Sequence, residues 1–72
     1  MSAVVHIDAR GMRCPWPAVR LAKALRGGAK AVTVIADDPK APTELELVAT
    51  AANAKIAIVL DEVSPTFIVT LL

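Results

Sequence analysis

Apolar and polar positions along the chain follow two different periods, and the change of period divides the sequence into strands and helices. In four short segments the apolar residues alternate with polar ones or run on without interruption, as in half-buried and fully buried strands. In two longer segments they recur at intervals of three and four residues, as in amphipathic helices. The pattern predicts the order β-α-β-α-β-β, with strands over residues 4–8, 31–36, 55–61 and 66–72 and helices over residues 16–26 and 41–53.

Residues at the ends of the predicted helices support these boundaries. Pro15 and Pro17 suit the first turn of the first helix, and Gly27-Gly28 ends it. Asp38 precedes the second helix and is expected to be its N-cap. The stripe expected to be buried on the first helix consists of Ala18, Leu21, Ala22 and Leu25. The corresponding stripe on the second helix consists of Leu45, Val48, Ala49 and Ala52.

These elements predict one architecture. The strand over residues 31–36 is nearly all apolar and is expected in the centre of the sheet. In the first strand, Val5 and Ile7 are expected on one face and His6 on the other, and residues 61–65 are expected to form a hairpin-like connection. The fold class is therefore α/β, a two-layer sandwich with a four-stranded mixed sheet and two helices on one face. At 72 residues, we expect a single domain over residues 1–72.

Composition and charge exclude several classes of protein. A hydrophobic content of 56% is too high for a disordered chain, and a net charge of +1 argues against a strongly basic nucleic-acid module. No signal peptide is visible, and the apolar run over residues 56–60 is too short to span a membrane. Cys14 is the only cysteine, which excludes an intramolecular disulfide and a multi-cysteine metal site. A lone thiol favours a reducing compartment, so we expect the protein in the cytoplasm.

Reactive chemistry gathers in one place, around Cys14 at the predicted start of the first helix. Unpaired backbone N–H groups and the helix dipole give this end partial positive charge. Arg10 and Arg13 precede the cysteine, and Arg20 and Lys23 follow it about two turns later. Residues 1–30 carry a net charge of +5 against −4 for residues 31–72, so a basic end surrounds the cysteine. We therefore expect a lowered thiol pKa and a surface that attracts an acidic partner or an anion.

This region lacks a base, a second cysteine and a substrate pocket, which limits the reactions that Cys14 could carry out. His6 lies on the first strand with no sign that it reaches the cysteine as a base, and Asp37 and Asp38 are interpreted as turn and cap residues. The chain has no second cysteine to resolve a disulfide and is too short for a substrate pocket of ordinary volume. A thiol in such surroundings is suited to accept a chemical group, hold it and pass it to another protein. Trp16, expected to be exposed beside it, is a candidate docking residue.

The segment over residues 8–17, which reads DARGMRCPWP, resembles the TusA (SirA-like) family of small sulfur-carrier proteins. The hallmark of that family is D-x-x-G-hydrophobic-x-C-P-x-P directly before a helix, and residues 36–39, ADDP, resemble its second landmark. Length and element order match as well, so the resemblance covers essentially the whole chain.

The resemblance implies a sulfurtransferase-like relay in which Cys14 receives sulfane sulfur as a persulfide. Asp8, Gly11 and Arg13 would support the loop, and Pro15 and Pro17 would form its fixed frame. The donor would be a cysteine desulfurase or a rhodanese-type enzyme. The acceptor would serve tRNA thiolation, molybdenum-cofactor maturation or sulfur oxidation. The carrier would be a monomer with no resident cofactor, no metal, and no direct nucleic-acid or membrane partner. Arg10, Trp16, Arg20 and Lys23 are the candidates for docking or for stabilising an anion.

Two other readings of the residues remain open. A small sandwich with a basic end could be an interaction, RNA-binding or regulatory module without covalent chemistry, although the lack of stacking aromatics weighs against RNA. Alternatively, Cys14 could be a redox sensor that oxidises to a sulfenic acid. Substitution of Cys14 by serine would abolish a carrier's function, whereas an RNA binder would lose little and show steep salt dependence. A sensor would respond to peroxide without a sulfur donor.

Overall fold

The computed structural model describes residues 4–59 and 65–71, and these residues form the six predicted elements in the predicted order. The strands are β1 (Val4–Asp8), β2 (Ala31–Ile35), β3 (Ala54–Val59) and β4 (Thr66–Leu71), and the helices are α1 (Trp16–Arg26) and α2 (Ala41–Ala51). Only the ends differ from prediction: β2 ends one residue earlier, α2 ends two residues earlier, and β3 begins one residue earlier. Residues 60–64 and 72 lie outside the described residues, and with them most of the predicted hairpin connection.

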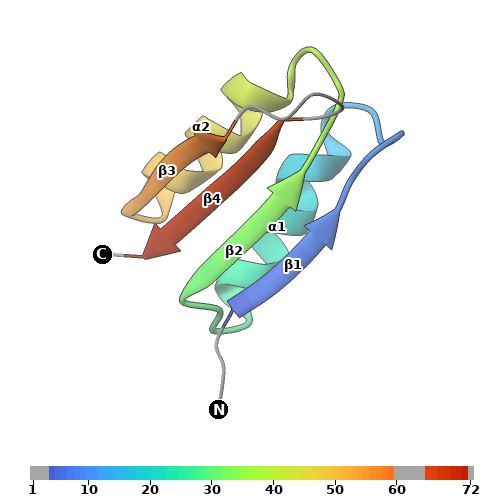
Figure 1. Cartoon of the computed structure of the whole chain (residues 1–72). Coiled ribbons are helices and arrows are strands. Elements are labelled where there is room, and N and C mark those ends of the chain that lie inside the picture. The colour runs from blue at the N-terminus through green and yellow to red at the C-terminus, as the bar shows by residue number, and fades with distance from the viewer. Residues whose placement is uncertain (1–3, 60–64, 72) are drawn as a thin grey trace.

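The four strands form one mixed sheet in the order β1-β2-β4-β3, covered on one face by both helices (Figure 1). β1 pairs in parallel with β2, while β4 lies antiparallel to both of its neighbours. β2 is thus an interior strand, which confirms the prediction from its apolar sequence. Because β1 and β2 are parallel, their carboxyl ends lie side by side at the same edge of the sheet.

The core lies between the sheet and the two helices. Val32 and Val34 of β2 point into it, and Phe67 and Val69 of β4 pair with them in register and are equally buried. In β1, Val5 and Ile7 align with the two buried valines, whereas His6 aligns with Thr33 on the other face, as predicted. Period-two alternation was therefore sufficient to assign the faces of the strands.

Both helices place their predicted stripes against the sheet. Leu21 of α1 and Leu45 of α2 are fully buried, together with Ala18 and Ala49. The other four members of the stripes are half-buried: Ala22, Leu25, Val48 and Ala52. In the part of the chain that the structure describes, neither helix is long and apolar enough to cross a membrane.

The start of α2 differs from prediction. Its N-cap is Lys40, not Asp38, because residues 38–40 make a turn before the helix begins. In this turn the Lys40 amide donates to the Asp38 carboxylate at 2.8 Å, and the Ala41 amide donates to the Asp38 carbonyl oxygen at 3.0 Å. Asp38 therefore stabilises the turn that precedes α2 instead of capping the first turn of this helix.

Candidate functional site

The loop that carries Cys14 runs from the end of β1 to the start of α1, at the carboxyl edge of the parallel strands. Its first residue, Ala9, is fully buried and donates its amide to the Ile35 carbonyl oxygen at 2.8 Å. The Met12 amide returns to the Ala9 carbonyl oxygen at 3.1 Å, which closes a turn around Gly11. Gly11 has φ +80°, a left-handed conformation that glycine adopts without strain. The motif glycine is thus required by the turn.

The first half of the loop is closed by an ion pair between neighbours in sequence. Arg10 donates from Nε and from a terminal guanidinium nitrogen to the two carboxylate oxygens of Asp8, at 2.9 and 2.7 Å, and its amide donates to the same carboxylate. This bonding lowers the pKa of Asp8 to about 2 and raises the pKa of Arg10 above its already high value. Arg10 is therefore committed to Asp8 instead of to Cys14.

The second half of the loop is held by two carboxylates from the segment after β2. The Gly11 amide donates to Asp37 Oδ1 at 2.9 Å, and the Cys14 amide donates to Asp38 Oδ2 at 3.3 Å. The other carboxylate oxygen of Asp38 accepts from the Lys40 amide. Asp38 thus links the backbone of the cysteine loop to the approach of α2. The ADDP segment of this chain thus has a structural role in shaping the cysteine loop.

Cys14 itself lies half-buried directly before the amino end of α1. The Cys14–Pro15 peptide bond is cis, and Pro15 occupies the N-cap position. The Trp16 amide donates to the Arg13 carbonyl oxygen at 2.9 Å, and the Val19 amide donates to the Pro15 carbonyl oxygen at 3.0 Å. Pro17 lies in the first turn of α1, as predicted, and is fully buried, whereas Pro15 stands one residue before the helix.

The electrostatic environment of Cys14 is opposite to the one predicted from the sequence. The pKa of the thiol is raised, first by partial burial, then by hydrogen bonding to Glu44 and by the negative charges of Glu44 and Asp38. Among the described residues, the cation that opposes this rise is Lys40. The expectation that the neighbouring arginines lower the thiol pKa is therefore wrong, because burial and the acidic groups of the α2 region raise it.

The predicted docking residues of α1 do come together. Trp16, Arg20 and Lys23 line one shallow hollow on the outer face of α1, together with Val19. Trp16 is 59% exposed, as predicted, and Val19 is 44% exposed. This face combines apolar surface with two cations next to the cysteine loop. Arg13 is also exposed.

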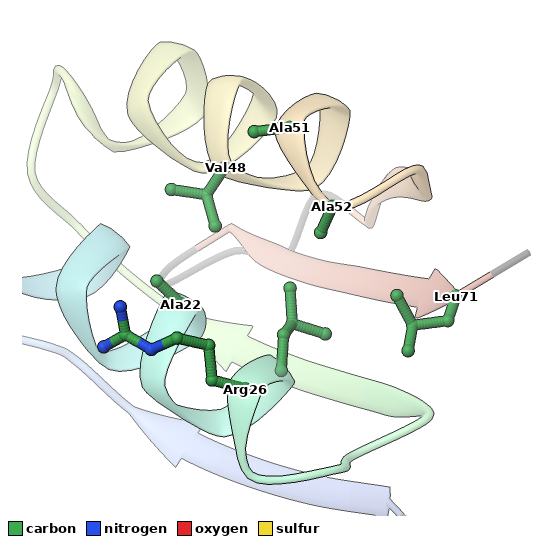
Figure 2. A pocket seen from close by; sticks show the side chains of 7 residues that line it. Ala22, Arg26, Val48, Ala51, Ala52 and Leu71 are labelled. Atoms are coloured by element: carbon green, nitrogen blue, oxygen red, sulfur yellow. The ribbon is translucent and has the colours of Figure 1, made fainter.

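A separate groove of about 480 Å³ lies between the carboxyl-terminal halves of the two helices (Figure 2). Three of its lining residues are alanines, and Val48 of α2 points toward α1 in Figure 2. The lining residues are Ala22, Leu25, Arg26, Val48, Ala51, Ala52 and Leu71. Cys14 precedes the opposite end of α1, so this groove does not belong to the cysteine site. Across residues 4–59 and 65–71, no cluster of histidine, cysteine, aspartate or glutamate side chains could hold a metal ion.

Comparison with known proteins places this geometry in a family. A family model described as Sulfurtransferase TusA matches residues 5–71. The chain belongs to the TusA family. A crystal structure of a SirA-like protein from Desulfitobacterium hafniense superposes with a TM-score of 0.80 at 26% identity, covering 92% of this chain and 93% of that one. A search of curated proteins gives no match. The resemblance stated from the sequence is thus confirmed, together with its fold.

Membership of the TusA family implies a role as a sulfur carrier that works with partner proteins. Sequence reasoning interpreted Asp37 and Asp38 as turn and cap residues and missed their hydrogen bonds to the cysteine loop. It also missed the effect of Glu44 on the thiol pKa. The predicted topology held a signal for the two aspartates, because residues that follow parallel strands meet at one edge of the sheet. Glu44 carried no comparable signal, since its approach to Cys14 depends on where the turn over residues 38–40 starts α2.

Proposed function

We propose that this TusA-family protein carries sulfane sulfur as a persulfide on Cys14, receiving it from a donor enzyme and passing it to an acceptor protein. The observation that carries the proposal is the position of Cys14: half-buried, directly before α1, in a loop anchored at both ends. A thiol held in this way is accessible to another protein. The exposed face of Trp16, Arg20 and Lys23 supports docking beside it.

Both transfer steps balance without an external oxidant or reductant. In loading, the sulfur of Cys14 attacks the outer sulfur of the donor's cysteine persulfide. A sulfur–sulfur bond forms on Cys14, the bond in the donor breaks, and the donor leaves as a thiol after the proton of Cys14 is transferred to it. In discharge, an acceptor cysteine attacks the outer sulfur of the Cys14 persulfide in the same way, and Cys14 leaves as a thiol. The donor is proposed to be a cysteine desulfurase or a rhodanese-type enzyme.

The acceptor is proposed to serve tRNA thiolation, molybdenum-cofactor maturation or sulfur metabolism. A cysteine that must stay reduced between cycles suits a reducing compartment, so we expect the carrier to work in the cytoplasm. It is expected to act as a monomer with little turnover of its own, because each half-reaction depends on a partner enzyme. No resident cofactor is proposed beyond the transient persulfide sulfur.

The experiment that tests the proposal is the intact mass of the protein after incubation with a cysteine desulfurase and L-cysteine. We expect a gain of one sulfur atom that a reductant reverses and that Cys14→Ser lacks. Serine has the shape of cysteine and is slightly smaller, so an unchanged circular-dichroism spectrum in the variant isolates the loss of the thiol. If no gain is seen, the experiment is repeated with a rhodanese and thiosulfate. Failure to gain sulfur from both donors would overturn the carrier role and favour an interaction or RNA-binding module.

A further inference from the structure

In the described sheet, β1 lies at one edge and pairs with β2 on its inner side (Figure 1). An edge strand directs every second backbone N–H and C=O group away from the sheet, where another extended chain can pair with them. A lysine or a proline in an edge strand discourages such pairing, and β3, at the opposite edge, carries Lys55. The sequence of β1, VVHID, has neither. The outer edge of β1 is therefore suited to accept a further strand.

A cleft of about 480 Å³ follows this edge, between β1 and α1. Val5 and Ile7 line it from β1, on the face of the sheet that the helices cover. Arg20 and Lys23, which are one helical turn apart, line it from α1 together with Gly27. Because successive side chains of a strand point to opposite faces, a strand added to β1 directs every second side chain into this cleft.

The cleft is positively charged. Arg20 and Lys23 are exposed, and among the residues that the structure describes neither forms an ion pair. Asp8 also lines the cleft, but both of its carboxylate oxygens are bound by Arg10, at 2.9 and 2.7 Å. His6, the remaining ionisable residue of the lining, adds no negative charge in either protonation state. Acidic side chains on an added strand therefore complement the two cations.

We propose that the outer edge of β1 binds an extended acidic segment of a partner protein, which pairs with β1 as an additional strand and places alternate carboxylates against Arg20 and Lys23. In this mode of recognition, backbone hydrogen bonds supply affinity and the alternate side chains supply specificity. β1 leads directly into the loop of Cys14, so a segment bound to it holds its protein beside the thiol. The inference goes beyond the carrier function and does not depend on it, because this binding involves no sulfur chemistry.

The probe is a capped peptide of alternating glutamate and threonine, which has all of its carboxylates on one face when it is extended. Its binding is followed by NMR, through the exchange of backbone amide protons with deuterium. We expect exchange to slow in β1 and to stay unchanged in β3, the opposite edge strand. Unchanged exchange in β1 up to the solubility limit of the peptide would overturn the inference, as would equal slowing in the two edge strands.

A second peptide separates strand pairing from attraction by charge alone. Arg20 and Lys23 also line the hollow of Trp16 on the outer face of α1, where an acidic peptide could bind without contacting β1. Methylation of every peptide nitrogen keeps the carboxylates but removes the N–H donors that a strand needs. The methylated peptide is expected to leave amide exchange in β1 unchanged. Equal binding of the two peptides would show that the strand edge is not used.

Substitutions in the protein test the role of the cations. Arg20→Gln combined with Lys23→Gln should weaken binding of the unmethylated peptide about threefold to tenfold, because both charges are exposed and screened by water. Arg26→Gln combined with Lys55→Gln is the matched control, since it removes the same net charge from exposed positions outside the cleft. It should bind the peptide as the wild type does. Equal weakening in the two double variants would contradict the assignment of the acidic segment to this cleft.

Discussion

The two halves of the cysteine loop are held by carboxylates in different ways. On the β1 side, Asp8 binds Arg10, two residues away, through short charged bonds on an exposed surface. On the α1 side, Asp37 and Asp38 bind the backbone amides of Gly11 and Cys14 across 26 and 24 residues. The first pair orders a few neighbouring residues, whereas the second joins two segments that only the folded chain brings together. The shorter bonds are therefore not the ones that shape the site.

Loss of Asp38 is expected to have the largest effect on this arrangement. Asp38→Ala leaves the amides of Cys14 and Lys40 without their acceptor, which should lower the free energy of unfolding by about 1–3 kcal/mol. Urea denaturation measures this change. Asp38→Asn is the comparison variant, because it removes the charge and one acceptor oxygen but keeps the other oxygen for one of the two amides. Stability should therefore fall less in Asp38→Asn, while the Cys14 pKa should fall in both variants.

Equal stability losses in the two variants would show that one remaining acceptor oxygen does not stabilise the loop. A Cys14 pKa that stays unchanged in both would contradict the electrostatic account of the site. The pH profile of Cys14 alkylation by iodoacetamide separates these outcomes, since it reports the charge near the sulfur independently of unfolding.

Gly11 connects the two halves of the loop, and its replacement should have the next largest effect. Its φ of +80° disfavours any side chain, although no atom lies within 4 Å of the position that a Cβ would occupy. Gly11→Ala should therefore cost backbone strain alone, about 1–2 kcal/mol in the free energy of unfolding. A control is Gly27→Ala, at a position with φ −77°, which should change stability less. A larger loss for Gly27→Ala would contradict this reading of the turn.

These contacts show which parts of the molecule could be predicted from its sequence. Strands, helices and the faces of Val32 or Leu21 follow from short-range periodicity, so the architecture was predictable to within two residues at the element ends. Cys14 and its prolines were predictable because their motif is contiguous. The direction of the Cys14 pKa shift was not predicted, because charged residues close to Cys14 in sequence were assumed to be close to it in space. Arg10 proved to be bound to Asp8, while the charges that act on the thiol come from 24 to 30 residues further along the chain.

Asp37 offers a smaller test of the long-range half of the loop. Asp37→Ala removes the exposed acceptor of the Gly11 amide, which water can replace, so we expect a loss of about 0.5–1.5 kcal/mol in urea denaturation. Asp37→Asn keeps an acceptor oxygen and should recover most of that loss. Because Asp37 is not among the groups that raise the Cys14 pKa, neither variant should shift the alkylation midpoint. A shifted midpoint would mean that the loop itself had moved.

The smallest effect is expected on the local half of the loop. The pKa of Asp8 is lowered to about 2 in the folded protein, so its ion pair stabilises the fold above the ordinary aspartate pKa near ~4. That contribution is lost as the pH falls from about 4 toward 2, because the carboxylate becomes protonated in both states. Asp8→Asn should therefore differ slightly from the wild type in urea midpoint at pH 7 and still less near pH 2. It should leave the Cys14 alkylation profile unchanged, since neither Asp8 nor Arg10 is among the groups that shift the Cys14 pKa. If Asp8→Asn destabilised the protein more than Asp38→Ala, the order of importance argued for the two halves of the loop would be reversed.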